Sequence, residues 1–314
     1  MKVLITGATG FVGSHLVDYL SKLPNIEIWG TKRRRSPLDN LQSPVNLIDC
    51  EITDYFNVTN VIGDLQPDRI FHLAAQSFVP LSWRAPDLTI QVNVLGTLNL
   101  LEAVRNLSPS TRVLIAGSSE EYGLVKPEEC PITEDQPFRP QSPYAVSKVA
   151  MELLALQYVA SYGLHIVTTR AFNHTGPRRG EHFVESSFCK QIALIEKGKQ
   201  EPFILCGNLD AQRDYTDVRD IVKAYWLALE KCPPGEPFNI CSGRVRSVRD
   251  LYFKLVRMTN TAPKVRQKPE LMRPSDVPLL QGSYAKFKAL TGWKPEIDWS
   301  KTLNDLLKYW REKV

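Results

Sequence analysis

Through roughly the first 170 residues, short runs of β-branched and other apolar residues alternate with longer segments in which apolar residues recur every three or four positions. The runs predict strands at 3–5, 26–29, 45–48, 69–73, 113–116 and 166–169. The periodic segments predict helices at 13–23, 55–65, 90–107 and 144–162. A parallel neighbouring strand is reached only by a crossover connection, and a helix between two strands supplies one. Such βαβ crossovers are right-handed. This alternation predicts an α/β fold, a Rossmann-type doubly wound parallel sheet with both faces covered.

Beyond about residue 172 the pattern becomes irregular. Loops rich in Gly, Arg and Pro separate predicted helices at 184–197, 218–231 and 247–258 and a predicted strand at 238–241. We therefore predict a sheet domain over residues 1–172, with 215–242 returning to it. Residues 173–314 are expected to form a smaller, discontinuous α/β lobe.

Composition excludes several classes of protein. The 314 residues are 43% hydrophobic and 23% charged, a balance that excludes disorder, and no stretch approaches the roughly 18 apolar residues of a membrane span. The net charge of +5 is mild, and four of its positive charges lie in one short run, so a nucleic-acid partner is not expected. The six cysteines form no C-x-x-C pair and share no metal-ligand spacing with the histidines, so reduced thiols and no metal are expected. We expect a soluble cytoplasmic protein with no membrane partner.

A glycine-rich turn separates the first predicted strand from the first predicted helix. It reads Thr6-Gly7-Ala8-Thr9-Gly10-Phe11-Val12-Gly13. Glycine lets backbone N–H groups approach a ligand closely, and the start of a helix attracts a pyrophosphate. The spacing alone is weak evidence, and a purely structural turn is the alternative. The position between strand and helix favours a dinucleotide site.

The second predicted strand runs into Thr31-Lys32-Arg33-Arg34-Arg35. A Rossmann protein that prefers NAD places an acidic residue here, against the ribose hydroxyls. This chain has no acid at that place, and its hydroxyl and cations suit the 2′-phosphate of NADP. We predict that NADP(H) is preferred over NAD(H), with a solvated basic loop as the alternative.

A Tyr-x-x-x-Lys pair places a phenol one helical turn from a cation that lowers its pKa. The chain has four such pairs, at Tyr122/Lys126, Tyr144/Lys148, Tyr284/Lys288 and Tyr309/Lys313. Only Tyr144/Lys148 opens the helix after the fifth predicted strand. Ser118 and Glu120 follow the end of that strand, where a doubly wound sheet forms its ligand crevice. We therefore expect Ser118, Glu120 and Tyr144 to share one cleft with the glycine-rich turn.

These motifs together resemble the extended short-chain dehydrogenase/reductase superfamily of nucleotide-sugar epimerases, dehydratases and reductases. The resemblance is carried by the glycine-rich turn, His72-Leu73-Ala74-Ala75, Ser118 and Tyr144-x-x-x-Lys148, and it covers essentially the whole chain. Segments 172–180, 213–220 and 273–278 resemble the branch that acts on GDP-mannose derivatives. The resemblance implies that residues 1–172 bind NADP(H) and that the second lobe binds a GDP-sugar.

The resemblance also implies roles for individual residues. Ser118 would hold the C4 oxygen of the hexose, Tyr144 would exchange its proton, and Lys148 would lower the Tyr144 pKa and bind the nicotinamide ribose. The implied cofactor ligands are Gly7, Thr9, Gly10, Phe11, Val12, Gly13, Thr31, Arg33, Glu51, Ile52, Leu73, Ala74, Ala75, Asn93, Tyr144, Lys148 and His174. The implied substrate ligands are Ser77, Ser118, Asn173, Arg179, Lys190, Arg213, Arg273 and Asp276. Glu51 departs from the Asp that the family usually places at the end of the third strand, which leaves its adenine contact open.

Three functions are left open. The first is reduction of the C4 keto group of GDP-4-keto-6-deoxy-D-mannose, which gives GDP-D-rhamnose. The second is 4,6-dehydration of GDP-mannose, which needs a further acid or base, and Glu120 has the right spacing from Ser118. Dehydratases of this branch usually read Arg-Asp-Trp-Gly-His where residues 213–217 read Arg-Asp-Tyr-Thr-Asp, and they are longer, so the reductase is favoured. The third, a non-catalytic NADP-binding regulator, typically lacks the Tyr or Lys kept here. The resemblance further implies a homodimer formed by the helices at 90–107 and 144–162.

Overall fold

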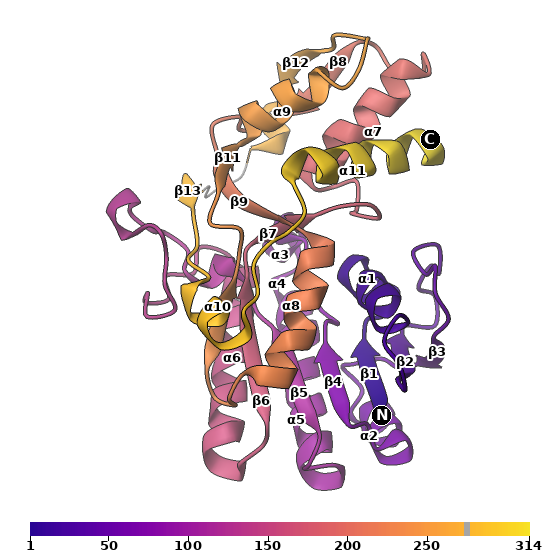
Figure 1. Ribbon diagram of the computed structural model, residues 1–314, viewed down its shortest axis with the longest axis vertical. Coiled ribbons are helices and arrows are strands. Elements are labelled where there is room, and N and C mark those ends of the chain that lie inside the picture. The colour runs from indigo at the N-terminus through magenta and orange to yellow at the C-terminus, as the bar shows by residue number, and fades with distance from the viewer. Residues whose placement is uncertain (273–276) are drawn as a thin grey trace.

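Seven parallel strands form the large central sheet of the computed structural model, which describes residues 1–272 and 277–314 (Figure 1). Their order across the sheet is β10-β6-β5-β4-β1-β2-β3. The strands are β1 (Lys2–Thr6), β2 (Glu27–Lys32), β3 (Asn46–Asp49), β4 (Arg69–His72), β5 (Arg112–Ala116), β6 (Ile166–Ala171) and β10 (Pro237–Ile240). The order reverses between β1 and β4, which is where a doubly wound sheet opens a ligand crevice. The predicted Rossmann-type α/β fold is confirmed.

Helices cover both faces of this sheet. Along β1, Val3 and Ile5 pack into one apolar layer and Leu4 packs into the other, because successive side chains of a strand point to opposite faces. Complete burial of one such side chain contributes about 1.5–3 kcal/mol. The first layer is covered by α1 (Phe11–Leu20) and α8 (Val218–Lys231), and the second by α2 (Tyr55–Leu65), α5 (Gly96–Leu107) and α6 (Pro143–Tyr162).

The helix predicted at 90–107 has a more complex start than its periodicity indicates. Two short helices precede it, α3 (Val79–Arg84) and α4 (Pro86–Ile90), and a π-helical turn at Gln91–Leu95 leads into α5. The π turn carries the fully buried Asn93. Turns of this kind are frequent at functional sites.

The second lobe stands over the carboxyl ends of the sheet strands (Figure 1). It contains a four-stranded sheet of β7 (Asn173–Thr175), β9 (Gln212–Asp217), β11 (Val245–Ser247) and β13 (Leu279–Leu280), and a pair of β8 (Phe203–Cys206) and β12 (Lys264–Gln267). Its helices are α7 (Val184–Glu196), α9 (Val248–Val256) and α11 (Trp299–Lys313), whereas α10 (Ala285–Thr291) packs against β10 of the large sheet. The core of the lobe joins Trp299, Leu303 and Trp310 of α11 to Phe188 and Ile192 of α7.

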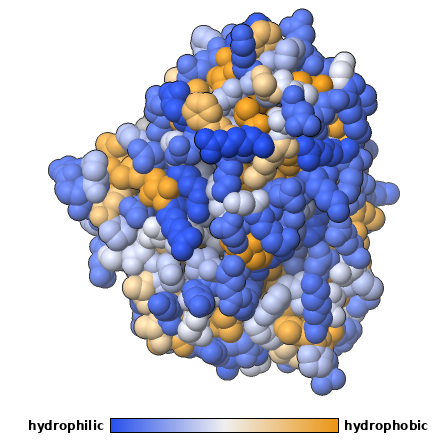
Figure 2. All heavy atoms as spheres, turned by 45° about the horizontal axis from the view of Figure 1, so that its top comes forward, coloured by the Kyte–Doolittle hydropathy of each residue, from blue (hydrophilic) through white to orange (hydrophobic). Residues whose placement is uncertain are grey.

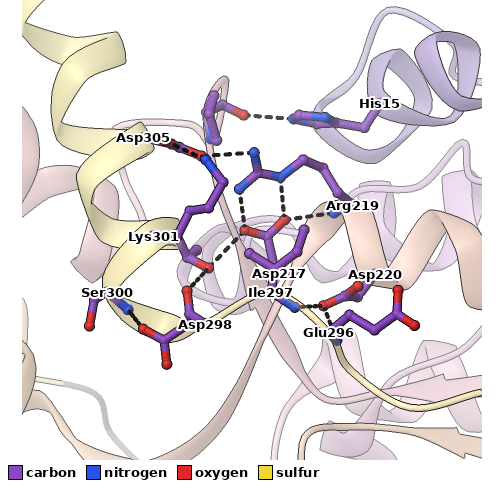
Figure 3. Close-up of polar contacts among 12 residues, drawn as sticks. His15, Asp217, Arg219, Asp220, Glu296, Ile297, Asp298, Ser300, Lys301 and Asp305 are labelled. Atoms are coloured by element: carbon purple, nitrogen blue, oxygen red, sulfur yellow. Dashed lines mark hydrogen bonds and ion pairs between the residues drawn. The ribbon is translucent and has the colours of Figure 1, made fainter.

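An ion-pair cluster joins the lobe to the sheet where β9 passes into α8 (Figure 3). The Asp217 carboxylate caps α8 by accepting from the Arg219 backbone N–H at 2.9 Å. The Arg219 guanidinium donates to both Asp217 oxygens and, at 2.8 Å, to Asp305 of α11. The hydroxyl of Thr302, also on α11, donates to Asp217 at 2.7 Å. One buried carboxylate thus anchors two helices at the junction.

The molecular surface is predominantly hydrophilic on the face drawn in Figure 2, with apolar residues in scattered patches. None of the helices within residues 1–272 and 277–314 combines the length and apolar character that crossing a membrane requires. Short 3-10 turns occupy Ser119–Glu121, Pro127–Glu129 and Pro269–Leu271, and the first of these adjoins the candidate site.

Candidate active site

A cleft of about 580 Å³ lies between the carboxyl ends of the sheet strands and the second lobe. Most of the residues predicted from the sequence line it. These are Gly7, Thr9, Gly10, Phe11, Val12, Gly13, Thr31, Arg33, Glu51, Ile52, Leu73, Ala74, Ala75, Ser77, Ser118, Glu120, Tyr144, Lys148, Asn173, His174 and Arg179. The lining also includes residues that the sequence analysis missed, among them Ser36, Gln76 and Phe183. Ser36 directly follows the basic run, and this position could have identified it as a lining residue.

The glycine-rich turn forms a cradle at the start of α1. Gly7 has a φ of +70°, which only glycine adopts readily, and a Cβ at Gly13 would lie 2.4 Å from the Gly7 carbonyl oxygen. Gly10 caps α1 without a side-chain hydrogen bond, so no cap side chain covers the first-turn N–H groups. Such a helix start binds anions. The turn therefore fits the pyrophosphate of a dinucleotide.

The far end of the cleft is hydroxyl-rich and basic. The Thr31 hydroxyl accepts from the Gly7 N–H at 3.3 Å, which ties the end of β2 to the glycine-rich turn. Lys32, Arg33 and Ser36 follow on the lining, and Lys32 is also paired with Asp49. This donor set fits a phosphate on the ribose of the cofactor better than a bare hydroxyl.

A buried histidine holds the ends of β1 and β4 together. The Thr6 hydroxyl accepts from the N–H groups of Leu73 at 3.0 Å and Ala74 at 3.1 Å, so its own hydrogen is donated to His72 Nδ1 at 2.9 Å. His72 then carries its proton on Nε2 and donates to Thr97 Oγ1 at 3.0 Å. Burial lowers the pKa of His72 to about 3, so the ring is neutral. The network fixes the tautomer and places the Leu73–Ala74 backbone along the cleft.

The same network continues to the helix that carries Tyr144. The Thr97 hydroxyl donates to the Asn93 carbonyl at 2.6 Å, and the Asn93 side chain donates to Ser147 Oγ at 2.8 Å and accepts from the Gln76 N–H at 2.8 Å. Ser147 donates to the Tyr144 carbonyl at 2.6 Å. Asn93 was predicted as a cofactor ligand, but it is fully buried and does not line the cleft. The π turn aims its side chain inward, where it positions the Gln76 and Tyr144 backbones.

Two buried histidines should make the fold sensitive to acid. Burial is the largest cause that lowers the pKa of His72 to about 3 and of His15 to about 4, whereas the unfolded chain binds these protons near 6.5. Their stabilising contribution is therefore complete above pH 6.5 and falls as the pH drops toward 4, by about 1.4 kcal/mol per pH unit for each histidine. We expect the Tm to fall between pH 7 and pH 5. His72→Gln, which keeps an acceptor and a donor, should reduce this slope, and an unchanged slope would contradict the prediction.

Ser118, Tyr144 and Lys148 meet at the middle of the cleft. Lys148 Nζ donates to the Ala116 carbonyl at 2.7 Å and lies 5.9 Å from the centre of the Tyr144 ring. Burial raises the pKa of Tyr144, and a hydrogen bond with the Ser118 side chain partly opposes that rise. Burial also lowers the pKa of Lys148 to about 8, against a raising effect of Glu121. A protonated phenol therefore stands beside a hydroxyl and a titratable amine, as a proton-donating site requires.

Two adjacent glutamates have different environments. Glu120 lines the cleft, and its charge raises the pKa of Tyr144. Glu121, which the sequence analysis did not select, is fully buried, accepts from the Ser118 N–H at 2.6 Å and lies 3.7 Å from Arg170. Burial, with Glu152 next, raises its pKa. Glu121 therefore sets the backbone of Ser118 from below the cleft.

The lobe contributes His174 and Arg179 to the cleft. The His174 ring stacks at 6.1 Å on Phe11, and its Nδ1 donates to the Phe172 carbonyl at 2.8 Å. Burial lowers its pKa to about 4, so Nε2 is left as an acceptor. The Arg179 guanidinium lies 3.4 Å from the centre of the Phe183 ring and 3.5 Å from Glu185. These two side chains close the cleft from the lobe side.

The structure does not bring every predicted substrate ligand to the cleft. Lys190 lies in a separate hollow, paired with Glu181 and 5.6 Å from the Trp310 ring, because α7 turns that face toward α11. Arg213 is buried in the lobe, where it donates to the Val277 carbonyl at 2.6 Å. Arg273 and Asp276 lie outside the described residues.

A Rossmann sheet whose crevice joins a glycine-rich turn to a Ser, a Tyr and a Lys beneath a second lobe is the arrangement of the extended short-chain dehydrogenase/reductases. Residues 4–306 match the family model described as GDP-mannose 4,6 dehydratase, and the chain belongs to this family.

Two curated relatives and one solved structure are similar to nearly the whole of this chain. The chain is 35% identical to GDP-6-deoxy-D-mannose reductase of Pseudomonas aeruginosa, over 100% of this chain and 98% of that protein. It is 33% identical to GDP-mannose 4,6-dehydratase of Vibrio cholerae serotype O1, over 97% of this chain and 92% of that protein. A solved structure of RMD from Pseudomonas aeruginosa complexed with NADPH superimposes with a TM-score of 0.87 at 33% identity, with 100% of both chains covered.

Proposed function

We propose that this protein reduces the C4 keto group of GDP-4-keto-6-deoxy-D-mannose with NADPH and releases GDP-D-rhamnose. The observation that carries this proposal is the meeting of Ser118, Tyr144 and Lys148 in the cleft that also contains the glycine-rich turn and Arg33. Similarity to a GDP-6-deoxy-D-mannose reductase over the whole chain supports the choice of substrate.

Each residue has one part in this reaction. When bound, the nicotinamide cofactor supplies the hydride. The Tyr144 hydroxyl donates its proton to the C4 oxygen, and the Ser118 hydroxyl holds that oxygen by a hydrogen bond. The Lys148 ammonium favours the phenolate left on Tyr144, because an opposite charge lowers the pKa of a phenol. Asn173 and Arg179 would hold the sugar and its diphosphate from the lobe.

The proposal is tested by mixing the protein with NADPH and GDP-4-keto-6-deoxy-D-mannose, following NADPH oxidation and identifying the sugar by NMR. The 6-deoxymannose product is expected. Cofactor binding without turnover would overturn the reductase and favour a non-catalytic regulator.

Dehydration of GDP-mannose is the second candidate, because Glu120 places a carboxylate on the cleft lining close enough to affect the Tyr144 pKa. Similarity to GDP-mannose 4,6-dehydratases supports it. Incubation with GDP-mannose and NADP separates the two candidates, since a dehydratase accumulates the 4-keto sugar. Glu120→Gln should abolish any such activity and leave reduction of the ketone nearly intact.

Arg33 is proposed as the cation for the 2′-phosphate of the cofactor. Arg33→Ala should weaken NADPH binding about tenfold, the loss of one charge-assisted hydrogen bond, and leave NADH binding nearly unchanged. Titration of protein fluorescence with each cofactor measures both dissociation constants. Arg35→Ala is a matched control, because Arg35 is exposed in the same run but does not line the cleft. Equal weakening of the two cofactors by Arg33→Ala would refute the assignment.

A homodimer is proposed through the helices expected at 90–107 and 144–162. In the structure the first of these is the π turn and α5, which α4 precedes, and all three elements pack against α6. Val146 and Leu153 lie two helical turns apart on α6 and are half exposed, and Leu88 and Leu95 are exposed nearby. The wild-type chain of 35.6 kDa should therefore elute at twice that mass, as measured by light scattering. Leu153→Asp should give monomers, whereas Phe253→Asp on α9, at equal exposure, should not. A monomeric wild type would sink the proposal.

The six free cysteines support a reducing compartment such as the cytoplasm for this protein.

A further inference from the structure

Arg178 adopts a backbone conformation that its residue type disfavours. Its φ is +70°, in the left-handed region where glycine is normally found, and glycines stand on either side at Gly176 and Gly180. Its side chain is only 4% exposed, although no ligand-lining role was predicted for it. A buried arginine keeps a strained backbone conformation only where its contacts compensate for the strain, so those contacts indicate its role.

The Arg178 guanidinium binds two separate parts of the sheet domain. Nη2 donates to Asp18 Oδ2 at 2.6 Å and to His15 Nδ1 at 2.7 Å, both on α1, and Nη1 donates to the Asn40 carbonyl at 2.7 Å. His15 can accept because its ring is neutral, and its Nε2 donates to the Pro177 carbonyl at 2.9 Å (Figure 3). The lobe segment is thus attached to α1 by both a side chain and a backbone carbonyl.

The third contact reaches the β2–β3 loop, which begins with Arg33. Two further hydrogen bonds hold the loop. Asn40 Nδ2 donates to the Thr9 carbonyl at 3.2 Å, and Ser43 Oγ donates to Asp18 Oδ1 at 2.8 Å. Asp18 therefore accepts from both Ser43 and Arg178. The cluster therefore holds the second half of the loop, at Asn40 and Ser43.

The next residue in the chain, Arg179, points in a different direction from Arg178. Arg179 lines the cleft, where its guanidinium lies 4.9 Å from the centre of the Phe11 ring. Arg178 itself faces α1 and the β2–β3 loop and is absent from the lining of the cleft. Arg178 thus contacts the loop that follows Arg33, and Arg179 next to it lines the cleft.

We propose that Arg178 is a positioning residue that sets the preference for NADPH over NADH, by holding the β2–β3 loop so that Arg33 meets the 2′-phosphate. The inference rests on the proposed cofactor assignment of Arg33. A loop that is already ordered binds the phosphate without a further entropic cost, whereas a released loop must be ordered by each binding event. NADH, which lacks the phosphate, gains nothing from the ordered loop. The effect of losing Arg178 is therefore selective for NADPH.

The test uses Arg178→Gly, because glycine accepts the positive φ and the variant loses only the side chain. Dissociation constants for NADPH and NADH are measured by calorimetry without substrate. We expect NADPH binding to weaken about tenfold, NADH binding to change less than about twofold, and amide hydrogen exchange in the β2–β3 loop of the free protein to rise. Asp18→Asn, a milder change in the same cluster, should shift the preference in the same direction if Arg178→Gly does not fold.

Two comparisons separate the failure modes. Arg311→Ala removes another multiply bonded arginine, paired with Glu196 at 2.6 Å in the lobe, and should lower the Tm without changing the cofactor preference. If Arg33→Ala abolishes the preference while Arg178→Gly and Asp18→Asn leave it within about twofold, the positioning role is overturned. If Arg33→Ala itself leaves the preference intact, the 2′-phosphate assignment fails instead.

Discussion

Tyr144→Phe should lower turnover by about 10²–10⁴-fold while leaving the NADPH dissociation constant nearly unchanged. The variant removes the hydroxyl that is proposed to give up its proton to the substrate oxygen, and it keeps the ring that fills the buried site. Burial raises the pKa of Tyr144, so the phenol is protonated in the free protein and has a proton to donate. Steady-state kinetics and a fluorescence titration measure the two quantities.

Tyr309→Phe is the matched control for this prediction. Tyr309 belongs to another Tyr-x-x-x-Lys pair, and its hydroxyl accepts from Lys313 at 2.8 Å on α11, outside the cleft. Its replacement should leave turnover within about twofold, because a single surface hydrogen bond has little effect. Unaltered turnover in Tyr144→Phe would mean that a different residue donates the proton.

Lys148→Met should lower turnover by about 10²-fold or more and, unlike Tyr144→Phe, should also weaken cofactor binding. Methionine keeps the apolar stem but loses both the charge next to Tyr144 and the donor that the nicotinamide ribose would receive. The Ala116 carbonyl also loses its hydrogen-bond partner. Comparison of kcat with the cofactor dissociation constant separates the two losses.

The pH profile tests the same residue in the wild-type protein. Burial lowers the pKa of Lys148 to about 8, so the ammonium is lost as the pH rises through that value. Turnover should therefore fall on the alkaline side. Lys148→Arg, whose guanidinium keeps its charge, should move this fall to higher pH even if its overall rate is lower. A profile that is identical in the two proteins would show that Lys148 does not control it.

The sheet and the centre of the site could be predicted because their signals are local. The place of Tyr144 and Lys148 after the fifth strand distinguishes them from three other pairs with the same spacing. In the structure Tyr144 lies beside Ser118. The lobe was harder to predict, since β7, β11 and β13 have two or three residues each and show no alternation. By contrast, α11 was missed although Leu303, Leu306 and Trp310 have helical spacing.

The remaining differences depend on packing that the sequence does not display. Lys190 was expected at the substrate, but the docking of α7 on α11 directs it toward Trp310. Asn93 was expected at the cofactor, but a π turn rotates it inward. The tight turn buries Glu121 and leaves Glu120 less buried, and the sequence gives no sign of which of the two neighbours is buried. In each case tertiary contacts decide the direction of a side chain.

The return of α8 and β10 to the large sheet has a consequence for synthesis on the ribosome. The edge of β6 is unpaired until residues 237–240 emerge, and the apolar face around Phe71 and Val167 is uncovered until α8 arrives. An exposed strand edge and apolar face invite aggregation. A nascent chain that has completed β1 to β6 is therefore still prone to aggregation. We expect it to depend most on chaperones just before β10 leaves the exit tunnel.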